Sequence, residues 1–388
     1  MGTVLIENIG TVASGDLAEP ILNADSLFLA EGVIQEMNTH SHADLKIDAC
    51  GSAVMPGLID AHHHPYFGDF HPVVNAVGYT DRYMESGVTG LVSCGPYALP
   101  GHPLGPQAGV ALGILSAQSF AKVRPSGIKV YGECMIVEPG MNEADFSRAA
   151  AGGVKRIKFL LPVPTAEMAR NCVGWAHNHG MKVLTHCGGR KLVGEAKSIG
   201  EALQIIRPDV AAHLNGGPTP PYWEDAAWLL DETPCAADIV FGGNLGIAVK
   251  IVEKLMGQGR LDRLMLGTDS PTPGGMMAGG VAKFMAFLAS TSDLGPEQAV
   301  CLATGVTART HGLNTGVVKV GMPADLLIVS AKEGTPARDA LEEIKDGNPP
   351  AVGAVIVDGE LLHPPAHYPS GRYVGRSNPK QRPVIQRR

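Results

Sequence analysis

Residues 54–64 form an apolar run that ends in polar residues: Val54-Met55-Pro56-Gly57-Leu58-Ile59-Asp60-Ala61-His62-His63-His64. The apolar part is typical of a buried strand. Alternate residues of a strand point to the same side, so His62 and His64 can face one point while His63 faces away. Two neutral imidazoles that converge at a strand end indicate half of a transition-metal site. The alternative is a histidine-rich surface turn without a ligand.

The composition is that of an ordinary globular protein. Of the 388 residues, 45% are hydrophobic and 18% are charged, which is a typical balance. This length predicts about two domains, one of them large. Aromatic residues make up only 5% and the formal net charge is −7. Both values disfavour a nucleic-acid partner, since bases stack on aromatic rings and phosphates need basic side chains.

The chain shows no sign of secretion or membrane insertion. Residues 1–8 lack a basic segment followed by a long apolar segment, so we expect no signal peptide. No run of 18 apolar residues occurs, and we therefore expect no membrane span. The seven cysteines are odd in number and contain no C-x-x-C pair. This usage is typical of reduced thiols and predicts a cytoplasmic protein.

Strand-like segments separated by turns lie at both ends of the chain. Asp358-Gly359 lies between two apolar segments and predicts a hairpin turn. After residue 363 the chain is basic and rich in proline, which predicts an extended surface arm, or an arm on a neighbouring subunit, rather than a tail for an anionic partner. The predicted terminal strands are residues 3–6, 26–29, 32–37, 45–48, 316–329 and 351–361.

The middle of the chain alternates apolar strands with amphipathic helices. Such alternation over about 250 residues predicts an α/β fold with a parallel sheet, most economically a (β/α)8 barrel. We found no internal repeat. The predicted strands, after the first at 54–64, are residues 90–93, 129–134, 156–160, 182–185, 210–212, 237–241 and 264–267, and the clearest predicted helices are residues 166–179, 245–258 and 281–289.

Several of these predicted strands end in residues that bind metals. His186 follows the fifth strand, His213 the sixth and Asp269 the last, while Lys158 lies inside the apolar fourth strand. Functional side chains of such barrels lie at the carboxyl ends of the strands. One buried histidine at a strand end is usually structural, but this ordered set predicts a metal centre.

With Asp60-x-His62-x-His64 after Pro56-Gly57, and with the four residues above, the chain resembles the amidohydrolase superfamily. The segment Gly321-Met322-Pro323-Ala324-Asp325-Leu326 is similar to that family's return into its small domain. Over residues 1 to about 365 the resemblance implies a TIM-like (β/α)8 barrel at 56–314 and a small β-sandwich domain built from both chain ends, at 1–55 and 315–365. Residues 366–388 would be the extended basic tail.

The resemblance also implies the ligand roles. His62, His64 and Asp269 would hold the more buried of two divalent ions, and His186 and His213 the more exposed one. Lys158 would be carbamylated and bridge both ions, since a protonated amine cannot ligate a cation. The alternatives are a salt-bridged or snorkelling Lys158, or Lys155 in its place. Zinc suits these ligands, and iron, manganese or cobalt would also fit.

Such a centre implies hydrolysis by a bridging hydroxide. Two ions would lower the pKa of the bridging water towards neutrality, from about 15.7 in bulk. Asp269 would act first as general base and then as general acid, returning the proton to the leaving nitrogen.

Deaminases of this superfamily carry His-x-x-Glu near the sixth strand, whereas here His213 is followed by Leu214-Asn215-Gly216-Gly217. This favours hydrolysis of an amide or ester. The motifs at 213–219, 231–233, 242–244 and 304–316 resemble the enamidase subgroup, a set of homotetramers that open the cyclic enamide 6-oxo-1,4,5,6-tetrahydronicotinate. The predicted substrate is therefore a cyclic amide. A lactonase, a phosphotriesterase or a hydrolase of acyl-amino acids or dipeptides is the alternative, and a silent scaffold is disfavoured because no ligand is missing.

A carboxylated substrate needs cationic or multi-donor partners. The candidates are Arg190 and His102, in predicted active-site loops, and Asn244, at a predicted strand end. In the alternative interpretation neither residue binds substrate: Arg190 is a surface charge and His102 a turn residue. From the enamidase subgroup we would expect a stronger base at position 102 and a glutamate near the end of the fourth strand, where Lys158 lies, so a different cyclic amide stays open.

Overall fold

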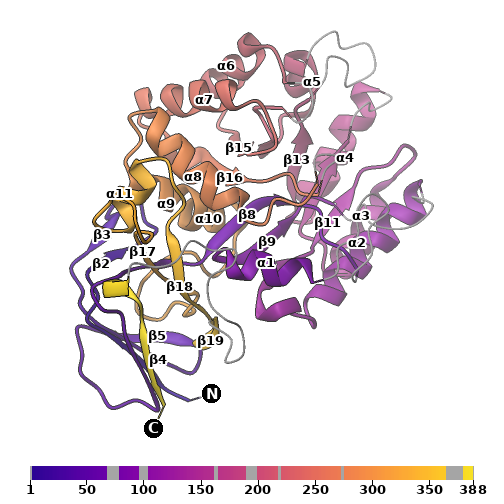
Figure 1. The fold of residues 1–388 in the computed structure, drawn as a ribbon. Coiled ribbons are helices and arrows are strands. Elements are labelled where there is room, and N and C mark those ends of the chain that lie inside the picture. Colours follow the sequence, from indigo (N-terminus) through magenta and orange to yellow (C-terminus); the bar gives the residue numbers. More distant parts are fainter. Residues whose placement is uncertain are drawn as a thin grey trace.

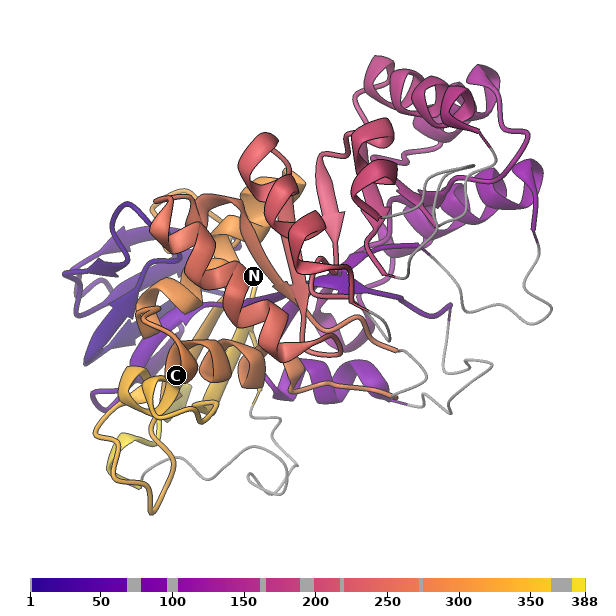
Figure 2. The same cartoon turned by 90° about the horizontal axis from the view of Figure 1, so that it is seen from above.

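The computed structural model describes residues 2–67, 78–95, 104–160, 165–188, 199–216, 220–271, 275–363 and 379–387. Two parts are visible: strands surrounded by helices in the middle of the chain, and two further sheets to which both chain ends contribute (Figures 1 and 2). Within the described residues, no helix is long and apolar enough to cross a membrane.

The middle of the chain forms parallel strands in two hydrogen-bonded groups, one of order β10-β9-β8 and one running in order from β11 to β16. The two groups join where β10 passes into β11. The other junction closes the ring, because the Asp269 backbone N–H donates to the His62 carbonyl (2.9 Å) and the His64 N–H donates to that of Ser270 (2.8 Å). The predicted barrel is thus confirmed. Its strands are β8 (Leu58–His63), β9 (Val88–Ser93), β10 (Lys129–Tyr131), β11 (Cys134–Ile136), β12 (Arg156–Phe159), β13 (Lys182–His186), β14 (Val210–Ala212), β15 (Ala236–Val240) and β16 (Leu264–Gly267).

The third barrel strand is interrupted, so the prediction of one strand at 129–134 was wrong. The chain bends at Gly132, whose carbonyl accepts a hydrogen bond from the N–H of Cys134 (2.9 Å). A Cβ at Gly132 would lie 2.6 Å from the Phe120 ring and 2.7 Å from the Ser116 carbonyl. Close packing against the preceding helix therefore coincides with the break between β10 and β11.

Helices cover the outside of the barrel and begin where the sequence offers a cap. Helix α4 (Ala166–Asn178) starts after Thr165, whose hydroxyl accepts from the Met168 N–H, and α7 (Leu245–Gly257) starts after Asn244. Both helices match their predicted ranges closely. The other helices are α1 (Tyr79–Glu85), α2 (Pro106–Phe120), α3 (Glu143–Ala151), α5 (Ile199–Ile206), α6 (Trp223–Glu232), α8 (Gly280–Thr291), α9 (Pro296–Cys301), α10 (Thr307–His311) and α11 (Ala340–Lys345).

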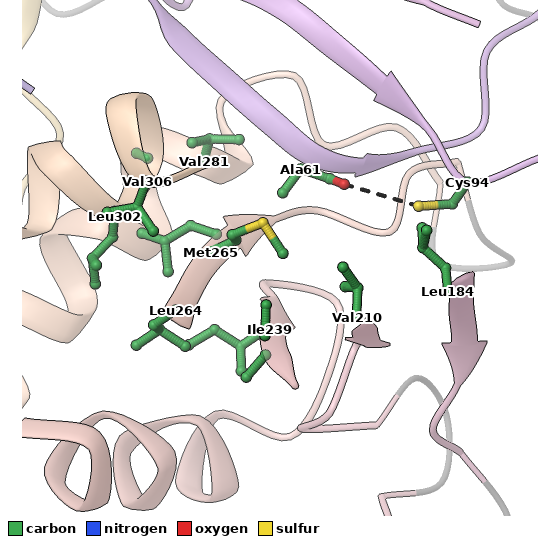
Figure 3. Packing of buried hydrophobic residues seen from close by; sticks show 14 of the residues in the cluster. Ala61, Cys94, Leu184, Val210, Ile239, Leu264, Met265, Val281, Leu302 and Val306 are labelled. Carbon is green, nitrogen blue, oxygen red and sulfur yellow. Dashed lines mark hydrogen bonds between the residues drawn. The ribbon is translucent and has the colours of Figure 1, made fainter. Parts of the chain in front are cut away.

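Strand and helix side chains meet in one large apolar core. Each large aliphatic side chain buried here stabilises the fold by roughly 1.5–3 kcal/mol. Near the carboxyl ends of the strands the thiol of Cys94 contacts the Ala61 carbonyl (3.9 Å; Figure 3). Figure 3 labels part of this core: Ala61, Cys94, Leu184, Val210, Ile239, Leu264, Met265, Val281, Leu302 and Val306.

The two terminal sheets share a second hydrophobic core. Ile6 and Ile47 of one sheet belong to the same buried cluster as Ile328 and Ile356 of the other. The first sheet has the order β20-β6-β1-β4-β5 and the second the order β19-β18-β17-β7-β2-β3. Their strands are β1 (Val4–Glu7), β2 (Thr11–Ala13), β3 (Ile21–Leu22), β4 (Leu27–Ala30), β5 (Val33–Met37), β6 (Leu45–Asp48), β7 (Ala53–Pro56), β17 (Leu326–Ser330), β18 (Ala351–Val357), β19 (Glu360–His363) and β20 (Val384–Arg387).

One of the predicted terminal strands is shorter in the structure. The strand predicted at 316–329 begins only at Leu326, because the preceding residues turn at Gly321, which has a φ of 87°. The end of the predicted extended arm forms strand β20, which pairs antiparallel with the β6 strand of the same chain. The hairpin at Asp358-Gly359 is confirmed. Both residues have a positive φ (46° and 75°), as a two-residue type I′ turn requires.

Candidate metal centre

The structure brings all six predicted ligand residues into one contiguous cluster at the carboxyl ends of the barrel strands. His62 contacts Lys158 (Nε2 to Nζ, 3.2 Å), and Asp269 Oδ1 lies 3.4 Å from His62 Nε2 and 3.1 Å from His64 Nε2. The His213 ring centroid lies 4.9 Å from that of His62 and 4.3 Å from that of His186. All six side chains are buried except His186, which is partly exposed.

His63 faces away from this cluster, as the strand period predicts. Its ring stacks on Tyr79 (5.9 Å between centroids) and meets Tyr83 edge-on (5.1 Å). The motif of three histidines therefore contributes two side chains to the site and one to the packing between β8 and α1.

Two of the ligand candidates have strained backbones. His213 has a φ of 40° and Asp269 a φ of 59°, which residues with a Cβ rarely adopt. The turn after His213 is held by Asn215, whose side chain accepts from the Val240 N–H (2.9 Å) and donates to the Val240 carbonyl (2.8 Å). Strain of this kind persists only where the surroundings enforce it, and it is concentrated at functional sites.

Two further carboxylates support the cluster, and sequence reasoning gave neither a role. Asp60 accepts from the Thr268 hydroxyl (2.5 Å) and the Thr268 N–H (2.8 Å), directly before Asp269. Asp238 Oδ2 lies 2.6 Å from His62 Nδ1. The sequence feature that could have identified Asp238 is its position as a single acidic residue inside the apolar segment 236–240. Lys158 was identified by the same kind of feature.

Burial keeps His62, His186 and His213 neutral. Desolvation, reinforced by the Lys158 charge, lowers the pKa of His186 to about 4 and holds that of His62 well below its ordinary value. Burial likewise depresses the pKa of His213. A metal-ligating histidine must be neutral, so these rings are ready to donate lone pairs near pH 7.

The two buried aspartates differ. Burial pushes the pKa of Asp269 upward, but the hydrogen bond with His64 (3.1 Å) and the electrostatic coupling of the carboxylate to the imidazoles of His62 and His213 outweigh it and hold the pKa well below the ordinary value. For Asp238, burial prevails over the opposing Lys158 charge and raises the pKa to about 8. Asp269 is therefore the ionised carboxylate that faces the histidines.

This donor set fits a divalent metal ion. One ligand atom each from His62, His64 and Asp269 lie within 4.8 Å of one another, all on buried residues. Within the described ranges, Nδ1 of buried His213 has no hydrogen-bond partner. Neutral imidazoles with an ionised carboxylate are the ligands of zinc and similar transition metals. The residues could therefore hold such an ion.

Lys158 is the lysine that lies in the site. It is only 1% exposed, whereas the alternative, Lys155, has a side chain 70% exposed that pairs with Glu133 (3.4 Å). The prediction that Lys158 would be the ligand, and not Lys155, therefore has geometric support. A buried lysine beside neutral imidazoles is costly unless it is paired or modified.

Of the three predicted substrate contacts, the described residues include Asn244. Arg190 and His102 lie outside the described residues. Asn244 is exposed, and its side-chain oxygen caps α7 by accepting from the Ile247 N–H (2.9 Å). Its substrate contact stays a prediction, but the structure gives the residue a local role that the sequence reasoning missed.

Known proteins are similar to this chain in both sequence and fold. The model of the amidohydrolase family matches residues 246–362. Enamidase from Eubacterium barkeri is 36% identical over 369 residues, which cover 93% of this chain and 96% of that protein. A crystal structure of enamidase, described as a member of the amidohydrolase superfamily, superposes with a TM-score of 0.91 at 34% identity and covers 99% of this chain and 100% of its own. A putative prolidase from Bifidobacterium longum is 19% identical and has a TM-score of 0.59, with 92% of this chain and 94% of its own covered, so it shares the fold alone.

Proposed function

The chain belongs to the amidohydrolase family as a homologue of enamidase, and we propose from this membership that it hydrolyses the C–N bond of a cyclic amide. The substrate class that fits best is a six-membered cyclic enamide such as 6-oxo-1,4,5,6-tetrahydronicotinate. One observation carries the proposal: a chain matched to enamidase over nearly its whole length brings the whole ligand set together at the carboxyl ends of its barrel strands, with five of the six side chains buried.

The ligand set divides between two ions in the proposal. His62, His64 and Asp269 would hold one, and His186 and His213 the other, with carbamylated Lys158 between them. Zinc is the metal these donors suit best, while iron, manganese or cobalt would also fit. When bound, the ions supply Lewis acidity, which lowers the pKa of a water molecule and polarises the amide carbonyl.

Asp269 is the proposed proton carrier. Its pKa is held well below the ordinary value, so it is ionised at neutral pH and can accept the proton of the attacking water. The water oxygen bonds to the amide carbon, the C–N bond breaks, and Asp269 returns the proton to the nitrogen. The ring then opens to a carboxylate and an enamine, whose imine tautomer takes up a second water and releases ammonia and an aldehyde.

We further propose an arrangement of domains and subunits. Residues 56–314 would form the catalytic barrel, and residues 1–55 and 315–365 a β-sandwich domain. The shared buried cluster of the two terminal sheets supports this division. By resemblance to the enamidase subgroup the chain would be a cytoplasmic homotetramer.

A substrate panel tests the proposed function. The purified chain, loaded with zinc, would be offered cyclic enamides and lactams, lactones, phosphotriesters, acyl-amino acids and dipeptides, and ammonia and acid release would be measured. We expect turnover of a cyclic amide, with ammonia released where the product is an enamine. Turnover confined to lactones, phosphotriesters or linear substrates would contradict the proposal.

A further inference from the structure

Asp238 lies at the centre of strand β15, and the reaction proposed above does not use it. Its side chain is buried (1% exposed) within an otherwise apolar strand. One of its oxygens, Oδ1, has no hydrogen-bond partner among the residues that the structure describes. A carboxylate buried in this way is costly and therefore calls for a physical reason.

The other oxygen of Asp238 joins two elements of the metal centre. Oδ2 lies 2.6 Å from Nδ1 of His62, and it also accepts a hydrogen bond from the backbone N–H of His213 (3.4 Å). The Asp238 carbonyl accepts from the N–H of Leu214, the next residue (2.7 Å). One residue on β15 thus contacts the ring of one ligand candidate and the backbone of another.

The far side of the His62 ring faces the ligand cluster, with Nε2 3.2 Å from the Lys158 nitrogen. Nδ1 faces Asp238 on the other side. A ring proton on Nδ1, donated to the ionised Asp238 carboxylate, is therefore the arrangement that leaves Nε2 free for an ion. This tautomer leaves the Nε2 lone pair directed towards Lys158 and Asp269.

Strand β16 leaves room for this contact at Gly267. A Cβ at that position would lie 2.8 Å from both the Cβ and the backbone nitrogen of His62, and 3.3 Å from Oδ1 of Asp238. Real Cβ atoms do not approach backbone atoms that closely. The glycine therefore allows His62 and Asp238 to meet beside β16.

We propose that Asp238 is a positioning residue, which holds His62 with Nδ1 protonated and Nε2 free to bind the ion. The inference rests on the metal centre of the proposed function. Histidine ligands commonly donate their second N–H to a carboxylate, and loss of such a partner weakens metal affinity or activity by about 10–100-fold.

Cobalt binding tests the proposal without any substrate. The chelated protein would be titrated with Co²⁺ against a competing chelator, with the visible spectrum recorded, for the unmodified chain, Asp238→Asn and Glu343→Gln. Glu343 is the matched control, because it is fully buried in α11, away from the site, and accepts a hydrogen bond from the Thr335 hydroxyl (2.6 Å). We expect Asp238→Asn to bind Co²⁺ about 10–100-fold more weakly and with an altered spectrum, and Glu343→Gln to match the unmodified chain.

Equal affinity and an unchanged cobalt spectrum in Asp238→Asn, whether or not its melting temperature falls, would overturn the positioning role. Gly267→Ala offers a second variant, which keeps both side chains, displaces His62 from Asp238 and should weaken cobalt binding in the same way.

Nuclear magnetic resonance of the chelated, ¹⁵N-histidine-labelled chain tests the tautomer without metal, with His62→Gln used only to assign the signal. Above pH 8, where Asp238 is ionised, the signal lost in His62→Gln should show a protonated Nδ1, and a protonated Nε2 would overturn the inference. An unmodified chain that shows this tautomer but binds no Co²⁺ would contradict the proposed metal centre instead.

Discussion

Asp269 combines three properties that single it out at the level of the residue. It is buried among histidines, its backbone is strained, and its pKa is depressed. Backbone strain at a residue with an ionised side chain is typical of a functional site, since the surrounding fold must enforce the strain at a cost in stability.

Replacing Asp269 with asparagine should separate proton transfer from metal retention. The amide oxygen can still face the ion, but it cannot accept and return a proton. We expect Asp269→Asn to keep its metal by elemental analysis and to lose at least about 100-fold in kcat, the usual scale of general acid–base catalysis. Near-normal turnover would refute the assigned role.

Lys158 in strand β12 and Lys155, which directly precedes this strand, make a matched pair for mutation. Lys158 lies in the site and Lys155 on the surface. We expect Lys158→Met to lose metal and activity, because no bridging group remains, while Lys155→Met keeps both. Elemental analysis of the two variants, together with the mass of the intact chain for a carbamate on lysine, measures this difference. An unchanged metal content in Lys158→Met would contradict the bridging role.

His311 predicts how stability depends on pH. Burial, reinforced by Arg156 and Lys182, holds its pKa well below the ordinary value, and neither ring nitrogen has a partner within the described residues. Below about pH 6.5 the unfolded chain binds a proton here that the folded chain does not. Stability therefore falls as the pH falls, by up to about 1.4 kcal/mol per pH unit for this one group.

The variant His311→Gln should reduce that slope. Urea unfolding of the chelated protein between about pH 5 and pH 6.5 would give the free energy of unfolding at each pH. The exposed His179 serves as control, since His179→Gln should leave the slope unchanged. A slope equally steep in His311→Gln and in the unmodified chain would show that this histidine does not set the acid limit.

Individual elements show what sequence patterns can and cannot specify. Strands β14 and β16 lie at the predicted residues, because short apolar runs bounded by polar turns define them locally. The third barrel strand did not follow its pattern, since its break at Gly132 coincides with close packing against α2, a tertiary contact. Local periodicity carries no information about such a contact.

The site divides in the same way. The ligand candidates were predictable because barrel topology brings the carboxyl ends of parallel strands together. Asp238 was not, since its contact joins β15 to His62 of β8, 176 positions apart in the chain. That pairing passes over the intervening strand β16 and depends on the space beside Gly267.

The start of α7 allows one test at the level of the element. Asn244→Ala removes the N-terminal cap, so we expect the free energy of unfolding to fall by about 0.5–2 kcal/mol, while Asn244→Asp keeps the cap and the stability. Thermal or urea unfolding measures both. If Asn244 also contacts substrate, kcat/KM should fall in the aspartate variant, whose carboxylate would repel an anionic substrate. Unchanged stability in Asn244→Ala would contradict the capping role.

The whole molecule joins its first and last segments beside the barrel. Strand β7 pairs with both β2 and β17, and β20 closes the edge of the sheet that contains β1. The chain enters the barrel directly from β7, so the first ligand strand, β8, begins at this junction. The terminal sheets therefore anchor the strand that contains His62 and leads directly to His64.

Metal reconstitution followed by ring opening tests the central claim most directly. The chelated protein would be titrated with Zn²⁺, and hydrolysis of 6-oxo-1,4,5,6-tetrahydronicotinate or a related cyclic amide would be followed by ammonia release. We expect activity to be absent without metal and to rise until about two ions are bound per chain, as a binuclear centre requires. Full activity in the chelated protein, or saturation at one ion per chain, would contradict the account.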